Sequence, residues 1–525
     1  MAYFPPSIDS PGGRGGEDLD AIISRFLAEN SSTTSFVAAG IATRESKASF
    51  VRTLLEAVGS PKSQNVVVPA LTALRILSRE PNGCQDLFLR QGICTLLRQA
   101  QLLGGESSGA QPAPPAQYSE TPVSVEALKC LCNVLLQHPP ARGTVRECGS
   151  VEVIAKILKD RHTSLPADTQ FLFLRLLFLI TVDDQATVAR LLEPDCDLPA
   201  TVVKLLHRAP TFEAPPGALV SEIMKTVYNL MAIGNVREEA EQQKGPTVVT
   251  LANTEVELAW VSKFENILPE IIKLLLATNS PAPLVPPLSH IVHTLLNFPL
   301  APYRAAFLKN GTDIVKRLCA ILTDTLNAQD PRKGAAAAGT DLDQVLPPLL
   351  IVMSGIARQD TAARAVMRGL LMPDDIDRSK PLDQGSTVTA RLIGFMTALV
   401  VPNVRESVCD LLYVLCDENA EKLVAYTGFG HAAGFLHSKG MMAPPSGGGG
   451  GGGGSSSSSE AFGSSFHPNT AGPMLDPITG EHDRRGSRSD WDGMTDEEKE
   501  EEAEKLLVLF DKLNKTGVIK VQMPQ

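Results

Sequence analysis

The sequence has few aromatic residues and no long apolar segment. Aromatic residues make up 5% of its 525 positions. The longest apolar run, Phe171 to Ile180, contains Arg175 and is shorter than the roughly 20 residues that a membrane-spanning helix needs. The first residues, Met1 to Ile8, have neither the basic start nor the apolar stretch of a secretory signal peptide. We therefore expect a cytoplasmic protein without a transmembrane segment.

Positive charge is also scarce. The chain has 48 Lys and Arg residues against 59 Asp and Glu residues, which gives a formal net charge of −11. A nucleic-acid-binding protein needs a clustered Lys/Arg surface to neutralise the phosphates. The charge balance therefore argues against a nucleic-acid partner.

Motifs for nucleotides and metals are absent as well. The sequence has no Gly-x-x-x-x-Gly-Lys-Ser/Thr loop and no His-Glu-x-x-His motif. Its nine cysteines are an odd number and lie mostly inside expected helices, which favours reduced, buried thiols. Cys130 and Cys132 have no second Cys or His pair at zinc spacing. The sequence therefore predicts no catalytic activity of its own, no cofactor and no metal site.

What the sequence does contain is a recurring helix pattern with one polar face. In Glu126 to Gln137, the residues Lys129 and Asn133 are four apart and share one face of a helix, while leucines occupy the other faces. The same register, a basic or imidazole side chain followed one turn later by an amide or a guanidinium, returns along the chain; Arg175 keeps only its first position. Its members, which we call the polar seam, are Arg75, Arg79, Lys129, Asn133, Arg175, Lys225, Asn229, His293 and Asn297.

The segments that carry the polar seam recur about every 45 to 70 residues, which is the armadillo or HEAT period lengthened by insertions. A typical unit is a short helix, a glycine bend, a second helix and a longer third helix, as in the stretch that begins with Ala141 to Cys148 and Gly149. Third helices are expected near residues 64–79, 122–137, 168–181, 219–233, 287–298, 343–358 and 403–416. The pattern predicts an all-α fold, an armadillo/HEAT-like right-handed superhelix, whose third helices line a concave groove.

Two plainer interpretations of the polar seam stay open. A helical pair of Lys and Asn side chains often forms only a solvated face. Alternatively, Asn133 holds the backbone of a neighbouring repeat, and Arg175 pairs with a carboxylate of the next repeat. Both roles are structural and leave these side chains unavailable to a ligand.

Composition divides the chain into four parts. Residues 1–17 are expected to be loose, and residues 18–440 to form the superhelical domain. Residues 441–473 contain eight consecutive glycines followed directly by five consecutive serines and are expected to be a flexible linker, followed by a tail at 474–525. Polar or Gly/Ala-rich insertions at 104–118, 235–252 and 327–341 are expected to be surface loops.

The tail contains an amphipathic helix pattern at about residues 495–516. Upstream of it, Ser457 and Ser489 each have an acidic residue three positions on and match an acidophilic kinase site. The helix is expected to dock, on the superhelix or on a partner, through an apolar stripe of Leu506, Leu509, Phe510 and Leu513.

Several segments resemble the synembryn family. They follow the family's order and cover most of the chain: Glu126 to Asn133, Arg175 to Leu179, Tyr426 to Gly434, Asp476 to Gly480 and Met494 to Leu513. The stretch from Tyr426 and the C-terminal helix are the most specific of these. The long glycine run is a departure, since the family is expected to have an acidic, phosphorylatable segment at that place.

The resemblance implies a function. Synembryn proteins are armadillo-type cytosolic exchange factors and folding chaperones for heterotrimeric G-protein alpha subunits. The client, GDP-bound or nucleotide-free, is expected to lay its C-terminal helix against the polar seam, with Phe178 and Tyr228 as flat apolar contacts. The tail helix is expected to grip a second surface of the client. We also expect a monomer that the client recruits to the cell cortex or plasma membrane.

A second function class stays open, a passive armadillo scaffold or transport adaptor that holds a linear peptide without exchange activity. An adaptor for basic cargo needs an acidic groove and usually places tryptophans beside its asparagines. The polar seam is basic instead, and the two tryptophans, Trp260 and Trp491, lie outside the expected seam helices.

Overall fold

The structure, a computed structural model, describes residues 4–5, 18–60, 65–104, 118–209, 216–242, 262–277, 284–309, 312–328 and 341–441, together with Thr479 and Glu481. All regular secondary structure in these ranges is helical. The all-α, armadillo-like class expected from the sequence is confirmed. The interpretations of the glycine-rich linker, of Ser457 and Ser489, and of the tail helix with its apolar stripe lie outside the described residues.

The helical region falls into two compact units, residues 1–328 with 344–366 and residues 329–343 with 367–525. The helices of the first unit are α1 (Leu19–Asn30), α2 (Arg44–Gly59), α3 (Val67–Leu77), α4 (Gln85–Phe88), α5 (Arg90–Gln99), α6 (Pro122–Gln137), α7 (Ala141–Glu147), α8 (Ser150–Arg161), α9 (Ala167–Thr181), α10 (Gln185–Leu191), α11 (Leu198–Arg208), α12 (Pro216–Gln242), α14 (Ile267–Ala277), α15 (Leu288–Leu296), α16 (Leu300–Phe307), α17 (Asp313–Ala328) and most of α18 (Leu342–Gln359). Across the boundary and into the second unit follow α19 (Thr361–Leu371), α20 (Val388–Phe395), α21 (Pro402–Leu415), α22 (Ala420–Thr427) and α23 (Phe429–Ser438).

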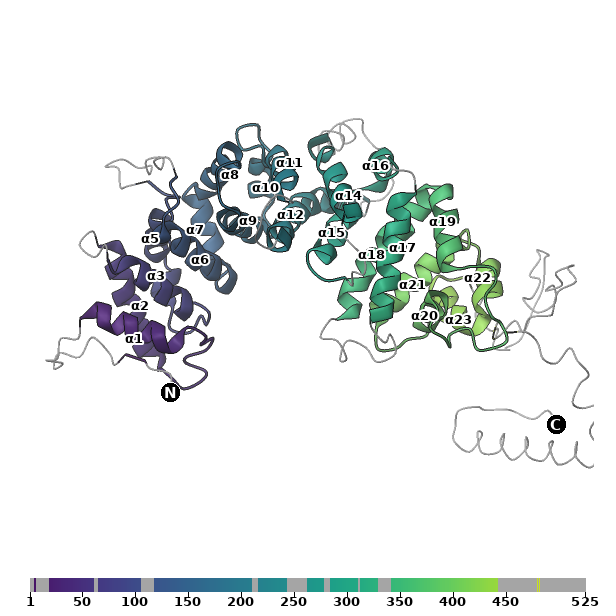
Figure 1. Cartoon of the computed structure of the whole chain (residues 1–525), viewed down its shortest axis with the longest axis horizontal. Coiled ribbons are helices and arrows are strands. Elements are labelled where there is room, and N and C mark those ends of the chain that lie inside the picture. The colour runs from purple at the N-terminus through teal and green to yellow at the C-terminus, as the bar shows by residue number, and fades with distance from the viewer. Residues whose placement is uncertain are drawn as a thin grey trace, which may run out of the picture. The chain divides into compact units, whose positions relative to one another are not determined.

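The first unit is built from helix triplets that stack in chain order. Its third helices pack in series, α3 on α6, α6 on α9, α9 on α12 and α12 on α15 (Figure 1). Glycines make the corners inside the triplets. Gly149, which precedes α8, has a φ of +68°. At Gly92, a Cβ would lie 2.4 Å from the carbonyl oxygen of Asp86, so only glycine at position 92 lets α5 pack this closely against α4.

The third helices lie where the pattern predicts them. For α6, the boundary is set locally, because Thr121 and Ser124 form a reciprocal capping box and Pro122 occupies the first turn. Its leucines Leu128 and Leu131 are fully buried, which fixes the face turned to the neighbouring helices.

One boundary differs from expectation: α12 continues to Gln242, beyond residue 235 where a surface loop was expected. The added residues, Val236 to Gln242, are mostly Glu, Arg, Ala and Gln, which are good helix formers.

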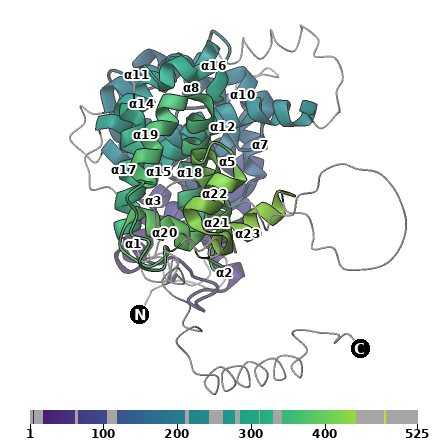
Figure 2. The same ribbon diagram turned by 90° about the vertical axis from the view of Figure 1, so that its right-hand side faces the viewer.

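The second unit ends in three mutually packed helices, α21, α22 and α23 (Figure 2). The corner between α22 and α23 is Gly428, whose φ is +80°. Next to this corner, the hydroxyl of Tyr426 donates a hydrogen bond to the carbonyl oxygen of Pro373 at 2.8 Å, and the guanidinium of Arg378 stacks over its ring at 5.6 Å. In this stretch, Tyr426 therefore fastens the corner to the loop that follows α19.

The N-terminal end of the first unit is closed by an aromatic cluster. Phe4 contacts Phe26, Phe36 and Phe50 with ring centroids 5.8 to 6.1 Å apart. Phe26, Phe36 and Phe50 are each at most 1% exposed. Phe4 lies within residues 1–17, the segment expected to be loose, and its ring makes edge-to-face contacts with the other three.

A buried ion pair supports this end. The ammonium of Lys47 is fully buried and lies 3.2 Å from the carboxylate of Glu80. The same carboxylate accepts backbone N–H groups from Phe36, Val37 and Ala38 at 2.8 to 3.0 Å. Burial opposes the charged form of Glu80, but the three backbone donors and Lys47 outweigh it and lower its pKa to about 2.

Replacing Glu80 tests this support. Glu80→Gln leaves Lys47 buried without a counter-charge, so we expect the free energy of unfolding to fall by about 3–5 kcal/mol in urea denaturation followed by circular dichroism. Because the folded-state pKa lies below the usual value of 4.5, the wild-type contribution is complete above that pH and is lost as the pH falls toward 2. Arg52→Gln, which breaks an exposed ion pair with Asp86, is the control and should cost less than about 1 kcal/mol. Equal losses for the two variants would contradict this account.

Candidate partner-binding face

The polar seam lies on the third helices of the first unit, from α3 to α15. Four of its cations are paired, because each of two glutamates of the same helices binds two of them. The carboxylate of Glu126 on α6 binds Arg75 Nε at 2.9 Å and Lys129 Nζ at 2.8 Å. The arrangement repeats two helices later. The carboxylate of Glu222 on α12 binds Arg175 Nη1 at 2.8 Å and Lys225 Nζ at 2.5 Å.

Sequence reasoning missed these glutamates as part of the face. The available signal was the spacing, since Glu126 precedes Lys129 by three residues, as Glu222 precedes Lys225, and residues three apart face each other on a helix. Burial opposes the charged form of Glu126, but Lys129 and Arg75 outweigh it and lower its pKa. The Glu126 carboxylate is therefore expected to be ionised at neutral pH, and its charge offsets part of the positive charge of the seam.

The asparagines of the seam connect successive third helices. Asn133 Nδ2 donates to the backbone carbonyl of Arg75 at 2.9 Å, Asn229 Nδ2 to that of Phe178 at 2.9 Å, and Asn297 Nδ2 to that of Tyr228 at 3.1 Å. We call each such bond, from a side chain to a carbonyl of the preceding third helix, a rung. A helical carbonyl has a second lone pair, so a rung forms without breaking the helix's own hydrogen bond.

Each asparagine rung has a companion one turn earlier. Three residues before the asparagines stand Cys130, Thr226 and Thr294, which donate to the carbonyls of Leu71, Leu174 and Met224 at 3.0 to 3.3 Å. In every case the second acceptor lies four residues before the first. The same two contacts thus recur at the junctions of α3 with α6, α9 with α12, and α12 with α15.

The junction of α6 with α9 lacks the asparagine rung. Leu179, which is 3% exposed, occupies the position in α9 that Asn133 and Asn229 occupy in their helices, and leucine has no donor. Arg175, four residues before it, keeps the basic position and pairs forward with Glu222 of α12. This is the carboxylate pairing that the sequence left open as an alternative for Arg175.

The register of α3 is one turn away from the expected one. Arg75 lies at the level of the Asn133 amide and supplies the carbonyl acceptor, rather than standing at the level of Lys129. Arg79 does not face the seam's ion pairs, because its guanidinium donates to the carbonyls of Ser31 and Thr33 at 3.0 and 2.8 Å. It is an anchor for the chain that follows α1.

The side chains of the face that are most open to a partner are aromatic and basic. Tyr228 is 36% exposed, and Phe178 is partly exposed. The ammonium of Lys225 lies 5.6 Å from the centre of the Phe178 ring, in cation–π geometry. Lys129 keeps 41% of its side chain exposed. Phe178, Lys225 and Tyr228 together, which we call the aromatic patch, belong to the neighbouring helices α9 and α12.

Two histidines extend the face on α15. His293 Nδ1 lies 2.7 Å from the carbonyl of Ser289 in the same helix. Burial, with the charges of Lys225 and His293 nearby, lowers the pKa of His290 to about 4, so it is neutral at physiological pH. His290 Nδ1 and Glu222 Oε2 are buried, and neither has a hydrogen-bond partner among the described residues.

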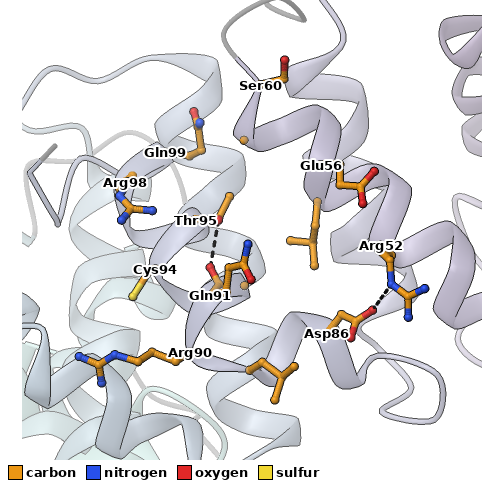
Figure 3. Close-up of a pocket in the computed structure, with 14 residues that line it drawn as sticks. Arg52, Glu56, Ser60, Asp86, Arg90, Gln91, Cys94, Thr95, Arg98 and Gln99 are labelled. Atoms are coloured by element: carbon orange, nitrogen blue, oxygen red, sulfur yellow. Dashed lines mark hydrogen bonds and ion pairs between the residues drawn. The ribbon is translucent and has the colours of Figure 1, made fainter. Parts of the chain in front are cut away.

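A cavity of about 990 Å³ lies elsewhere, between α2, α4 and α5 (Figure 3). It is lined by arginine, glutamine and acidic side chains, and none of the residues of the polar seam is among them. In the part of the chain that the structure describes, no helix combines the length and the apolar character needed to cross a membrane.

Comparisons with known proteins agree with one another. The Ric8 family model, described as guanine nucleotide exchange factor synembryn, matches residues 70–525. Chaperone Ric-8A of Bos taurus is 27% identical over 514 residues, covering 94% of this chain and 88% of the relative. Chaperone Ric-8A of Mus musculus is 28% identical over 510 residues, covering 94% and 89%, and that of Danio rerio is 27% identical over 544 residues, covering 96% and 90%.

Similarity to solved structures is weaker. A crystal structure of an engineered protein aligns with 73% of this chain and 88% of its own, at 15% identity and a TM-score of 0.35. A likeness at this level supports no argument about the site.

The rungs can be tested by removing one. Asn229→Ala deletes the donor to Phe178 and Thr181, so we expect the free energy of unfolding to fall by about 1–3 kcal/mol. Asn229→Asp keeps the size but turns a carboxylate toward a carbonyl, and it should cost at least as much. Lys129→Ala removes the more exposed partner of an ion pair and leaves Glu126 paired with Arg75, so as the control it should cost less than about 1 kcal/mol. Unchanged stability of Asn229→Ala, together with lost partner binding, would return this asparagine to the role of a ligand-binding group.

Proposed function

This chain belongs to the family of the guanine nucleotide exchange factor synembryn, and from this membership we propose that it acts as an exchange factor and folding chaperone for the alpha subunits of heterotrimeric G proteins. The family match, which spans residues 70–525, is the observation that carries the proposal. The relatives named chaperone Ric-8A, aligned over about nine tenths of the chain, support the chaperone half of it.

The client's C-terminal helix is proposed to lie across the third helices at the aromatic patch. Phe178 and Tyr228 offer flat apolar area at low entropic cost. Lys225, which lies over the Phe178 ring and pairs with Glu222, is proposed to bind a client carboxylate, including the free C-terminus, in exchange for part of that pairing. Asn133, Asn229 and Asn297 are assigned to the rungs instead, since their amide nitrogens already bind backbone carbonyls. We propose that four further seam residues border the contact with the client's helix: Arg75, Lys129, Arg175 and His293.

Exchange by this route needs no catalytic residue. Drawing the C-terminal helix out of the client's own fold loosens its guanine-nucleotide pocket. The exchange factor acts by binding the nucleotide-free state more tightly than the GDP-bound state, and the shift in population equals that difference in affinity. Binding the same helix of a client that has not finished folding would prevent that helix from making non-native contacts. This is the chaperone activity.

The surroundings of this activity are proposed from the sequence. We propose that the protein works as a monomer in the cytoplasm and reaches the cell cortex or plasma membrane only through its client. The tail is proposed to grip a second client surface with Leu506, Leu509, Phe510 and Leu513, and the glycine-rich linker joins the two grips so that the second binding event is intramolecular. Phosphorylation at Ser457 or Ser489 would add negative charge to the segment between the superhelical domain and the tail helix.

The first test is GDP release from a purified alpha subunit. We expect this protein to accelerate release from the intact client and not from a client truncated within its C-terminal helix. Tyr228→Ala and Lys225→Glu should each weaken client binding about 10- to 30-fold and slow exchange in proportion, as expected for a buried aromatic or charged anchor. Truncating Tyr228 leaves its backbone carbonyl in place for the Asn297 rung, so stability should change little.

Matched control variants lie on the same unit away from the aromatic patch. Leu89→Ala removes an apolar side chain that is 59% exposed between α4 and α5, and Lys316→Glu reverses a charge that is 61% exposed on α17. Both should bind and exchange like the wild type. Binding of the client without faster GDP release would support a passive scaffold or holding chaperone instead, and equal loss in patch and control variants would refute the placement of the contact.

A second test addresses the tail. Deleting residues 475–525 should lower affinity for the client by at least tenfold, because the intramolecular second contact is lost, while the remaining binding stays sensitive to Tyr228→Ala. Affinity can be measured by surface plasmon resonance with immobilised alpha subunit. Unchanged affinity and an unchanged exchange rate after the deletion would rule out the second grip.

A further inference from the structure

Two cysteines of neighbouring repeats lie side by side in the first unit. Cys94, in the middle of α5, and Cys148, directly after α7, have their Sγ atoms 3.7 Å apart. They are separated by more than fifty positions in the sequence, so the contact is made by the packing of α5 against α7. A disulfide has an S–S distance of about 2.05 Å, and these sulfurs need to approach by only roughly 1.7 Å.

The pair differs from the other cysteines in its accessibility. Cys84, Cys130, Cys196, Cys319, Cys409 and Cys416 are buried. Cys94 and Cys148 are both partly exposed, and Cys94 lines the open cavity between α2, α4 and α5 (Figure 3). Cys132 is also partly exposed, but its nearest cysteine, Cys130, is two residues away on the same helix, where side chains do not face each other. A small oxidant can therefore reach Cys94 from the cavity.

The surroundings hold the two sulfurs in position. Arg90, one turn before Cys94 on α5, pairs with Glu147, the residue that precedes Cys148. Cys148 is followed by Gly149, whose left-handed backbone forms the corner into α8 and has no atoms within 4 Å of where a Cβ would stand. The ion pair aligns the two segments, and the open glycine corner leaves Cys148 room for the small movement that a bond requires.

We propose that Cys94 and Cys148 are a modification site at which hydroperoxides form a reversible disulfide that clamps α5 to α7. The Cys94 thiolate attacks one peroxide oxygen, the O–O bond breaks, and Cys94 becomes a sulfenic acid. Cys148 then attacks the Cys94 sulfur, the S–S bond forms, and the S–O bond breaks with loss of water. In total, two thiols lose two electrons and two protons, and one hydrogen peroxide is reduced to two waters.

The order of the two steps follows from access and charge. Burial and the neighbouring Cys94 raise the pKa of the Cys148 thiol to about 11, so Cys148 is mostly protonated at neutral pH. Cys94, at the cavity, is the residue that meets the peroxide first. This inference does not depend on the proposed exchange activity.

Peptide mapping of the full-length protein tests the proposal. The protein is treated with hydrogen peroxide, remaining thiols are blocked with N-ethylmaleimide, and tryptic peptides are analysed by mass spectrometry. Trypsin places Cys94 in residues 91–98 and Cys148 in residues 147–156, each with one cysteine, so the cross-link is unambiguous. We expect these two peptides joined, with a mass two hydrogens lower than their sum, and separated again by dithiothreitol.

Variants and controls make the outcome decisive. Cys132→Ser should keep the cross-link, whereas Cys94→Ser and Cys148→Ser should abolish it, and Cys148→Ser should leave Cys94 trapped by dimedone as a sulfenic acid. The oxidised wild type should melt at a higher temperature than the reduced protein, and peroxide should not raise the melting temperature of Cys148→Ser. Both cysteines recovered with N-ethylmaleimide after peroxide, or a cross-link to another cysteine or a second chain, would overturn the proposal.

Discussion

The rungs between successive third helices are the constraint on which the face of the first unit depends. Apolar packing between helices is non-directional, whereas a side-chain donor aimed at one carbonyl fixes both the distance and the height of one helix against the next. Asn229 provides such a bond at the centre of the face, and Thr226 provides its companion one turn earlier. Because each rung joins neighbouring helices only, the register is passed from one helix to the next at the junctions of α3 with α6, α9 with α12 and α12 with α15. The position of Phe178, Lys225 and Tyr228 relative to one another is a result of this registration.

The fold could be predicted from the sequence more fully than the face could. Leucine periodicity, glycine corners and capping residues act within one helix or one turn, so α6 and α9 begin and end within a residue or two of the expected places. The roles of polar side chains depend on the helix across the junction. Nothing in the spacing of Asn133 distinguishes a donor to an incoming peptide from a donor to the carbonyl of Arg75. For the same reason the sequence pattern assigned Arg79 to the polar seam, although its guanidinium donates to the carbonyls of Ser31 and Thr33 and does not face the ion pairs of the seam.

The charge of the face was the other feature that a single helix could not reveal. A count of Lys and Arg residues along the seam predicts a basic surface, and the neutralising Glu126 and Glu222 change that picture. With the cations paired, long-range attraction of an acidic partner is weakened, and the rings of Phe178 and Tyr228 on α9 and α12 are the partly exposed aromatic area of the face. A partner suited to it would present an amphipathic helix more readily than a strongly acidic one.

The leucine at position 179 has a consequence for mechanics. The asparagine rung is missing between α6 and α9, so these helices are held by apolar packing and by the contact of Cys132 Sγ with the Leu172 carbonyl at 4.0 Å. When the junctions between successive third helices are strained together, the least stiff junction deforms most. Strain along the stack would therefore be concentrated between α6 and α9. The repeats before that joint and those after it would then move as two stiffer blocks, and the ion pair of Arg175 with Glu222, which joins α9 to α12, would lie within the second block.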